Sequence, residues 1–121
     1  MIAKDIRQQA IDNKFFRRVV DTGKYTQVVI MSIPPGGDIG EEVHKDTDQV
    51  LYLVQGRGEV IINGKTSAYE AGDLVLVAAG ERHNFVNTGS RALKIITAYS
   101  PPHHPVGTIH KTKKDADAAG Y

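Results

Sequence analysis

The fold is decided by Gly72-Asp73-Leu74-Val75-Leu76-Val77-Ala78-Ala79-Gly80-Glu81-Arg82-His83-Asn84-Phe85-Val86-Asn87. The glycine and aspartate at its start favour a turn, and the apolar run of residues 74–77 has the length of a buried strand. A second glycine turn follows. His83 and Phe85 then point to one face of the next strand, because side chains alternate from face to face along a strand. The stretch therefore predicts a histidine held on rigid β-structure.

A second group of polar residues lies upstream of this stretch. Glu42 and His44 are two residues apart, so an extended backbone places the carboxylate and the imidazole on one face. Gln49 opens an apolar run over residues 50–54, and a polar turn is expected just before it. Asp48 points to the opposite face of a regular strand, but a one-residue bulge would reverse it. Asp48 is therefore kept as an alternative to Gln49.

The two stretches together resemble the two motifs of the cupin superfamily, and they cover about half of the chain. The gap between the two motifs is short, as in small single-domain bacterial cupins. Within the second motif only the proline is replaced, by Ala78. The resemblance implies an all-β fold, the cupin double-stranded β-helix or jelly-roll barrel. The matching residues are Gly36, Glu42, His44, Gln49 and Gly56 in the first motif, and Gly72, Ala78, Gly80, His83 and Asn87 in the second.

The resemblance also implies a set of metal ligands. In cupins that bind metal, the ligands are usually the two His and the Glu of the first motif with the His of the second. Carried over by position, the ligands here would be Glu42, His44, Gln49 and His83. The carboxylate has moved from the position of Gln49 to that of Glu42, so an ion would still meet two imidazoles and one negative oxygen.

Each of these residues has a second interpretation. Gln49 offers a neutral amide oxygen, so it could orient a water or a substrate instead of binding the ion. Glu42 could be a ligand, the general base of a reaction or a solvated edge charge. His44 and His83 could each be a hydrogen-bonded core residue, although together at the family spacing they favour ligation. The roles of Gln49, Glu42 and the two histidines stay open at this point.

The composition limits the chemistry. The chain has no cysteine, which excludes a thiolate ligand, a disulfide and a nucleophilic thiol. Imidazole and carboxylate suit a divalent transition metal such as Fe, Mn, Ni, Co or Zn, and ligand type does not choose among them. The net charge of +1 gives no argument for nucleic acid or an anionic membrane. With no membrane-spanning run and no signal peptide, a cytoplasmic location is expected.

The fold alone does not decide the function. We expect a metal-dependent enzyme of the dioxygenase or isomerase type that acts on a small organic molecule in the barrel. The alternative is a non-catalytic cupin that binds or senses a metabolite or sugar. Arg57 and Arg82 are loop cations that could meet an anionic substrate, although solvated surface positions are the usual place for arginine.

The remaining sequence predicts short strands around turns, in a single domain over residues 1–121 with a barrel core at about 15–100 and an arm at 101–121. An open barrel leaves an edge strand, so a homodimer is expected. Further strands are expected at Phe15 to Val20, Tyr25 to Ile33, Glu59 to Ile62, Lys65 to Glu70 and Leu93 to Ser100. The alternation of side chains defines two strand faces, and it leaves open whether they line the cavity. One face consists of Tyr25, Gln27, Val29, Met31 and Ile33, and the other of Val50, Tyr52 and Val54.

The arm begins with Pro101-Pro102-His103-His104-Pro105, which cannot continue a strand ladder because proline lacks an N–H donor. Residues 113–119 could form a short helix. The histidines at 103, 104 and 110 could bind metal, but an arm packed on the barrel or on a partner subunit is the simpler expectation. Ser100 to Lys114 also resembles the tail of a group of small bacterial cupins.

Overall fold

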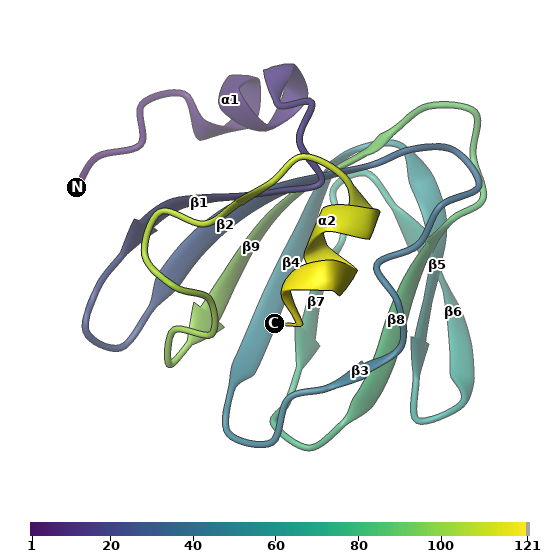
Figure 1. Cartoon of the computed structure of the whole chain (residues 1–121). Helices are drawn as coiled ribbons and strands as arrows, with labels where there is room; N and C mark the ends of the chain where they lie inside the picture. Colours follow the sequence, from purple (N-terminus) through teal and green to yellow (C-terminus); the bar gives the residue numbers. More distant parts are fainter. Residues whose placement is uncertain (121) are drawn as a thin grey trace.

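Two antiparallel sheets make up most of the computed structural model, which describes residues 1–120 (Figure 1). One sheet has the strand order β10-β1-β2-β9-β4-β7 and the other has the order β3-β8-β5-β6. A cluster of buried apolar side chains fills the space between them, so the predicted all-β jelly-roll barrel is confirmed. The strands are β1 (Arg17–Thr22), β2 (Gln27–Ile33), β3 (Glu42–Val43), β4 (Asp48–Gln55), β5 (Arg57–Ile62), β6 (Lys65–Glu70), β7 (Leu74–Val77), β8 (Arg82–Asn87), β9 (Leu93–Ser100) and β10 (Ile109–His110).

The strand boundaries follow the turn signals of the sequence. Asn63 and Gly64 join β5 to β6 with φ of 50° and 82°, the left-handed values that a tight hairpin needs and that this pair tolerates. Asn87, the last residue of the second motif, donates from its amide to Ile33 O and Arg91 O at 2.9 and 2.8 Å. It therefore ties β8 to neighbouring backbone and has a structural role.

The barrel interior divides into two ends along the same strands. In the larger sheet Gln27 pairs with Tyr99, which pairs with Gln49, and these three side chains lie at one end. Towards the other end the inward positions become apolar. We call the first region the polar end, lined by Gln27, Glu42, His44, Gln49, His83, Tyr99 and His103. The second is the apolar end, lined by Ile33, Leu53, Tyr69, Phe85, Leu93 and Ile95.

Strand phase decides which of the candidate cavity residues face inward. Along β4 the buried side chains include Gln49 and Leu51, whereas Tyr52 is exposed on the outer face. Tyr52 and its face-sharing neighbours are therefore not cavity residues. Tyr25 precedes β2 and is 70% exposed, while the other members of its predicted face, from Gln27 to Ile33, are fully buried.

A short helix that the sequence analysis did not predict covers the outer face of the larger sheet. This helix, α1 (Ile6–Asp12), packs its Ala10 against Ile30 and Val54 (Figure 1). Its amphipathic pattern is only two turns long, and the side chain of Asp5 makes no capping hydrogen bond. Asp5 is a possible start residue, but the apolar pattern that follows it is too short to predict a helix.

The arm packs on the barrel as expected. Residues beyond β9 return so that β10 pairs with β1, and the predicted terminal helix is present as α2 (Lys113–Ala119). Thr112 caps α2 by accepting from the Asp115 N–H, and Lys113 Nζ donates to Asp38 Oδ1 at 2.6 Å. Figure 1 shows α2 in front of the barrel, between the two sheets. Within residues 1–120 neither the length nor the apolarity of any helix suits a bilayer crossing.

Strand β7 forms one edge of the larger sheet and carries apolar side chains on its outer face. Leu74 and Leu76 are 64% and 61% exposed. A partner could cover such an edge. The homodimer stays a prediction.

Candidate metal site

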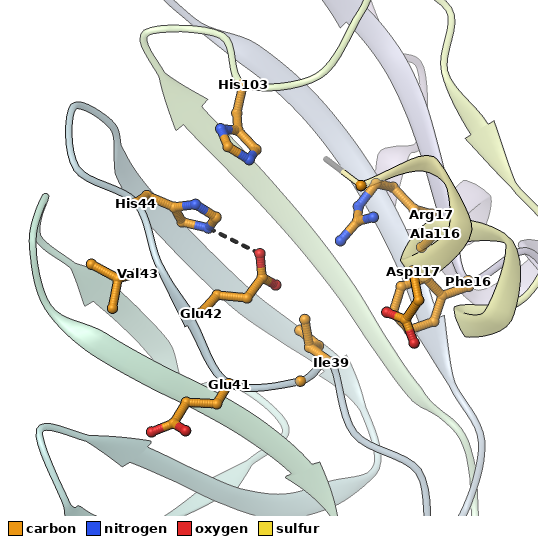
Figure 2. Close-up of a pocket in the computed structure, with 12 residues that line it drawn as sticks. Phe16, Arg17, Ile39, Glu41, Glu42, Val43, His44, His103, Ala116 and Asp117 are labelled. Carbon is orange, nitrogen blue, oxygen red and sulfur yellow. Dashed lines mark ion pairs between the residues drawn. The ribbon is translucent and has the colours of Figure 1, made fainter.

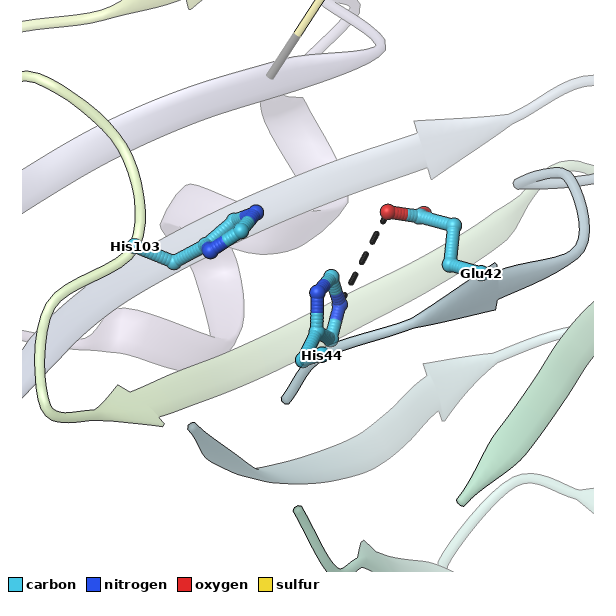
Figure 3. Close-up of side chains that lie close together, drawn as sticks. All are labelled: Glu42, His44 and His103. Atoms are coloured by element: carbon cyan, nitrogen blue, oxygen red, sulfur yellow. Dashed lines mark ion pairs between the residues drawn. The ribbon is translucent and has the colours of Figure 1, made fainter. Parts of the chain in front are cut away.

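Three side chains converge at the polar end of the barrel: Glu42, His44 and His103 (Figure 3). One ligand atom from each lies within 4.8 Å of the others. His44 Nε2 is 3.7 Å from Glu42 Oε2, and the rings of His44 and His103 are 4.4 Å apart between centroids. Two imidazoles and a carboxylate at this separation form a group that could hold a metal ion.

His83 lies beside this group. It sits on β8 directly opposite Glu42 of β3, and its ring centroid is 5.1 Å from that of His44. Its Nδ1 is 3.0 Å from Glu81 O. Because a carbonyl can only accept, Nδ1 carries a proton, and the tautomer that makes this bond has its lone pair on Nε2. A backbone carbonyl that fixes the tautomer in this way is typical of histidine ligands.

The side chain of Gln49 is buried and hydrogen-bonded to a neighbouring strand. Its Nε2 donates to Thr97 Oγ1 at 3.0 Å, and Thr97 in turn donates to Val50 O at 2.7 Å. The interaction of Gln49 with His44 acts to raise the pKa of that imidazole. This geometry favours the hydrogen-bonding interpretation of Gln49.

Asp48 lies outside the site. It is exposed, and its Oδ1 accepts from the Ala79 N–H at 2.8 Å. The register of β4 against β9 is regular at this point, so the bulge that would turn Asp48 inward is not present. The alternative that placed Asp48 among the ligands is therefore not supported.

His103 is brought to the group by a glutamine that clamps the arm. Gln27 Oε1 accepts from the backbone N–H groups of His103 and His104 at 3.2 and 2.9 Å, and its Nε2 donates to His104 O at 2.7 Å. Tyr99 stacks on the His103 ring, with centroids 5.6 Å apart and an angle of 21°. The arm is thus a wall of the site, and His103 is the arm histidine that joins the candidate metal group.

Burial controls the protonation of the site. Desolvation lowers the pKa of His44 to about 4, helped by the neighbouring His103 and His83. Desolvation also lowers the pKa of His103, with the charge of Arg17 as the second cause. His44 is therefore a neutral imidazole at pH 7, which is the form that binds metal. Burial raises the pKa of Glu42, and Arg17 acts against this shift.

A pocket of about 450 Å³ gives access to these side chains. Figure 2 shows Glu42, His44 and His103 on one side of it and Arg17, Ala116 and Asp117 on the other. The last two residues belong to α2, so the arm closes part of the mouth of the barrel. The volume lies in the range that small-molecule sites occupy.

A jelly-roll barrel with a group of imidazoles and a carboxylate at one end defines a class of small β-barrel proteins with a candidate metal centre. The sequence pattern of the cupin domain matches residues 29–99, and the chain belongs to that family.

Individual relatives agree with this assignment. The chain is 43% identical to uncharacterized protein YrkC of Bacillus subtilis (strain 168) over 122 residues, which cover 95% of this chain and 65% of YrkC. The chain therefore spans just under two thirds of that relative. A crystal structure of BH2720 from Bacillus halodurans has 39% identity and a TM-score of 0.95, over 97% of this chain and 93% of that one. A predicted oxalate decarboxylase from Thermotoga maritima has 29% identity and a TM-score of 0.62, over 65% of this chain and 69% of that one.

Proposed function

We propose that this protein is a metal-dependent cupin enzyme that acts on a small organic molecule in the barrel. The observation that carries the proposal is the convergence of Glu42, His44 and His103 on an open pocket, with His83 beside them. Structural similarity to a predicted oxalate decarboxylase supports enzymatic rather than storage use of the barrel. The reaction would be of the dioxygenase or isomerase type.

The side chains at the polar end have separate tasks in this proposal. His44, His83 and His103 would donate neutral nitrogens and Glu42 a carboxylate oxygen to a divalent ion such as Fe, Mn, Ni, Co or Zn. A bound ion supplies Lewis acidity or oxygen activation at a coordination position that the protein leaves open. Gln49 would orient the site from its bond to Thr97, and α2 would limit the entry of water.

The first experiment is elemental analysis of untagged protein purified without chelator, together with a matched pair of variants. Glu42 and Glu41 are adjacent in sequence, but only Glu42 belongs to the candidate metal group. Glu41 is exposed, and its Oε1 lies 3.8 Å from Arg82 Nε. We expect near-stoichiometric metal in wild type and Glu41→Gln, and strongly reduced metal in Glu42→Gln and His83→Ala. Equal metal content in all four proteins would overturn the site.

A second candidate function is non-catalytic capture of a metabolite. It is favoured by one observation: Gln49, at the position where the family motif has a carboxylate, is tied to Thr97. Turnover and binding separate the two functions. A metabolite that raises the melting temperature without being converted supports a binding protein, because a ligand that binds only the folded state stabilises it.

A further inference from the structure

We propose that Arg17 is the anion-binding residue of this pocket, and that the molecule bound there is a small carboxylic acid. Arg17 opens β1 and is only 3% exposed, yet it lines the pocket (Figure 2). The proposal rests on the proposed function, since it names the substrate class of the same site.

The guanidinium of Arg17 lacks a counter-ion. Its Nη1 lies 3.1 Å from His110 Nδ1, and its buried Nε has no hydrogen-bond partner. None of the ion pairs within residues 1–120 includes Arg17. A buried charge without an opposite charge in contact is costly, so this cation is poised for a partner that enters the pocket.

The positive charge of Arg17 acts on several titratable groups around the pocket. Burial lowers the pKa values of His103, His104 and His110, and the charge of Arg17 is the second cause in each case. Arg17 also acts on the pKa of His44, after burial and the neighbouring His103 and His83. The charge of Arg17 also acts on Glu42, which forms no ion pair with it. Glu41 and Asp117 line the same pocket, and in the described part of the chain neither of them pairs with Arg17, so a bound anion would supply the contact that Arg17 does not have.

The shape of the guanidinium selects the kind of anion. Its planar fork matches the two oxygens of a carboxylate, which it binds through parallel N–H···O bonds. The loop cations considered from sequence do not compete for this role, because Arg57 and Arg82 are exposed and neither lines this pocket.

The test is calorimetric titration of metal-loaded protein with malonate, with malonamide as its uncharged analogue. We expect Arg17→Met to weaken malonate binding at least about 10-fold, as loss of one partner of a buried charge pair does. Arg17→Lys should restore binding only in part, because lysine keeps the charge and loses the fork. Arg82→Met, the exposed control, should bind as wild type, and malonamide should bind to none of them.

Metal content and stability are measured on the same samples. Unchanged metal in Arg17→Met, together with metal-free stability equal to or above that of wild type, supports an unpaired charge held for a ligand. Equal malonate affinity in wild type and Arg17→Met at equal metal content overturns the proposal and leaves the metal site standing. Malonate binding that depends on Arg17 in a protein that never takes up metal supports Arg17 and overturns the metal-dependent function.

Discussion

The two ends of the barrel interior are built on the same strands and by the same alternation of side chains, but one is lined by apolar side chains and the other by polar ones. On β8, His83 faces the polar end and Phe85, two residues later, faces the apolar end. On β4, Gln49 and Leu53 make the same pair. The apolar end buries side chains that need no partner, whereas the polar end buries imidazoles at a cost in desolvation. We therefore expect the apolar end to stabilise the fold and the polar end to serve the proposed binding.

The largest expected effect is loss of stability at the apolar end. Phe85 is fully buried and meets Tyr69 edge to face, with ring centroids 5.2 Å apart. Phe85→Ala should lower the free energy of unfolding by about 3–5 kcal/mol, because it removes buried area and leaves a cavity. Urea denaturation of metal-free protein measures this change. Metal affinity of the folded variant should stay close to that of wild type, and a large loss of both would argue against two separate ends.

The reverse pattern is expected at the polar end. His44→Ala should weaken metal binding by more than about 100-fold, since changes outside the ligand shell alone cost about 10–100-fold. The metal-free variant should unfold at nearly the wild-type urea concentration, because a buried imidazole contributes little apolar burial. Competition with a chromogenic chelator measures the affinity. A stability loss as large as that of Phe85→Ala would make His44 a core residue.

A smaller effect is expected from the clamp on the arm. Gln27→Leu keeps the volume but removes all four hydrogen bonds of the Gln27 side chain, to Thr22 and to the backbone at 103 and 104. Metal affinity should fall by about 10–100-fold, because Gln27 positions His103 without touching the ion. Gln55→Leu is the matched control, since Gln55 bonds to Ala92 O far from the pocket group. Equal affinities in the two variants would show that His103 is not a ligand.

Short-range patterns explain why most of the fold could be predicted from sequence. The hairpin at Asn63-Gly64 and the strand over residues 74–77 depend on neighbours in the chain, and the structure has both. The expected burial of that strand is wrong for Leu74 and Leu76, because β7 is an edge strand whose outer face is uncovered. Glu42 and His83 were also expected to meet, and the pairing of β3 with β8 places them opposite each other. The two spaced motifs carry this information because β3 of the first motif pairs with β8 of the second.

His103 and Arg17 could not be placed in the same way. His103 reaches the site only through the return of the arm and its bonds to Gln27, which are contacts across more than seventy positions. Arg17 lies among Phe16, Arg18 and Val19, where a charged residue is normally expected on the solvent face. The inward phase of Arg17, shared with Val19, was the one signal that could have drawn attention to it.

The smallest expected effect is the pH dependence that His44 adds to the stability of metal-free protein. Its pKa is about 4 in the folded state, against 6.5 as the ordinary value, so the unfolded chain binds the proton more readily between these two pH values. Stability therefore falls as pH drops below about 6.5, and it is unaffected by His44 above that range. Between pH 7.5 and pH 6 the loss from His44 alone is on the order of 1 kcal/mol. Urea denaturation at both pH values should show a wild-type decrease that is larger than that of His44→Ala by this amount. Glu42, whose pKa burial raises, contributes to the pH dependence in the opposite sense. Identical pH dependence in the two proteins would mean that water reaches His44 freely and that the polar end is not desolvated.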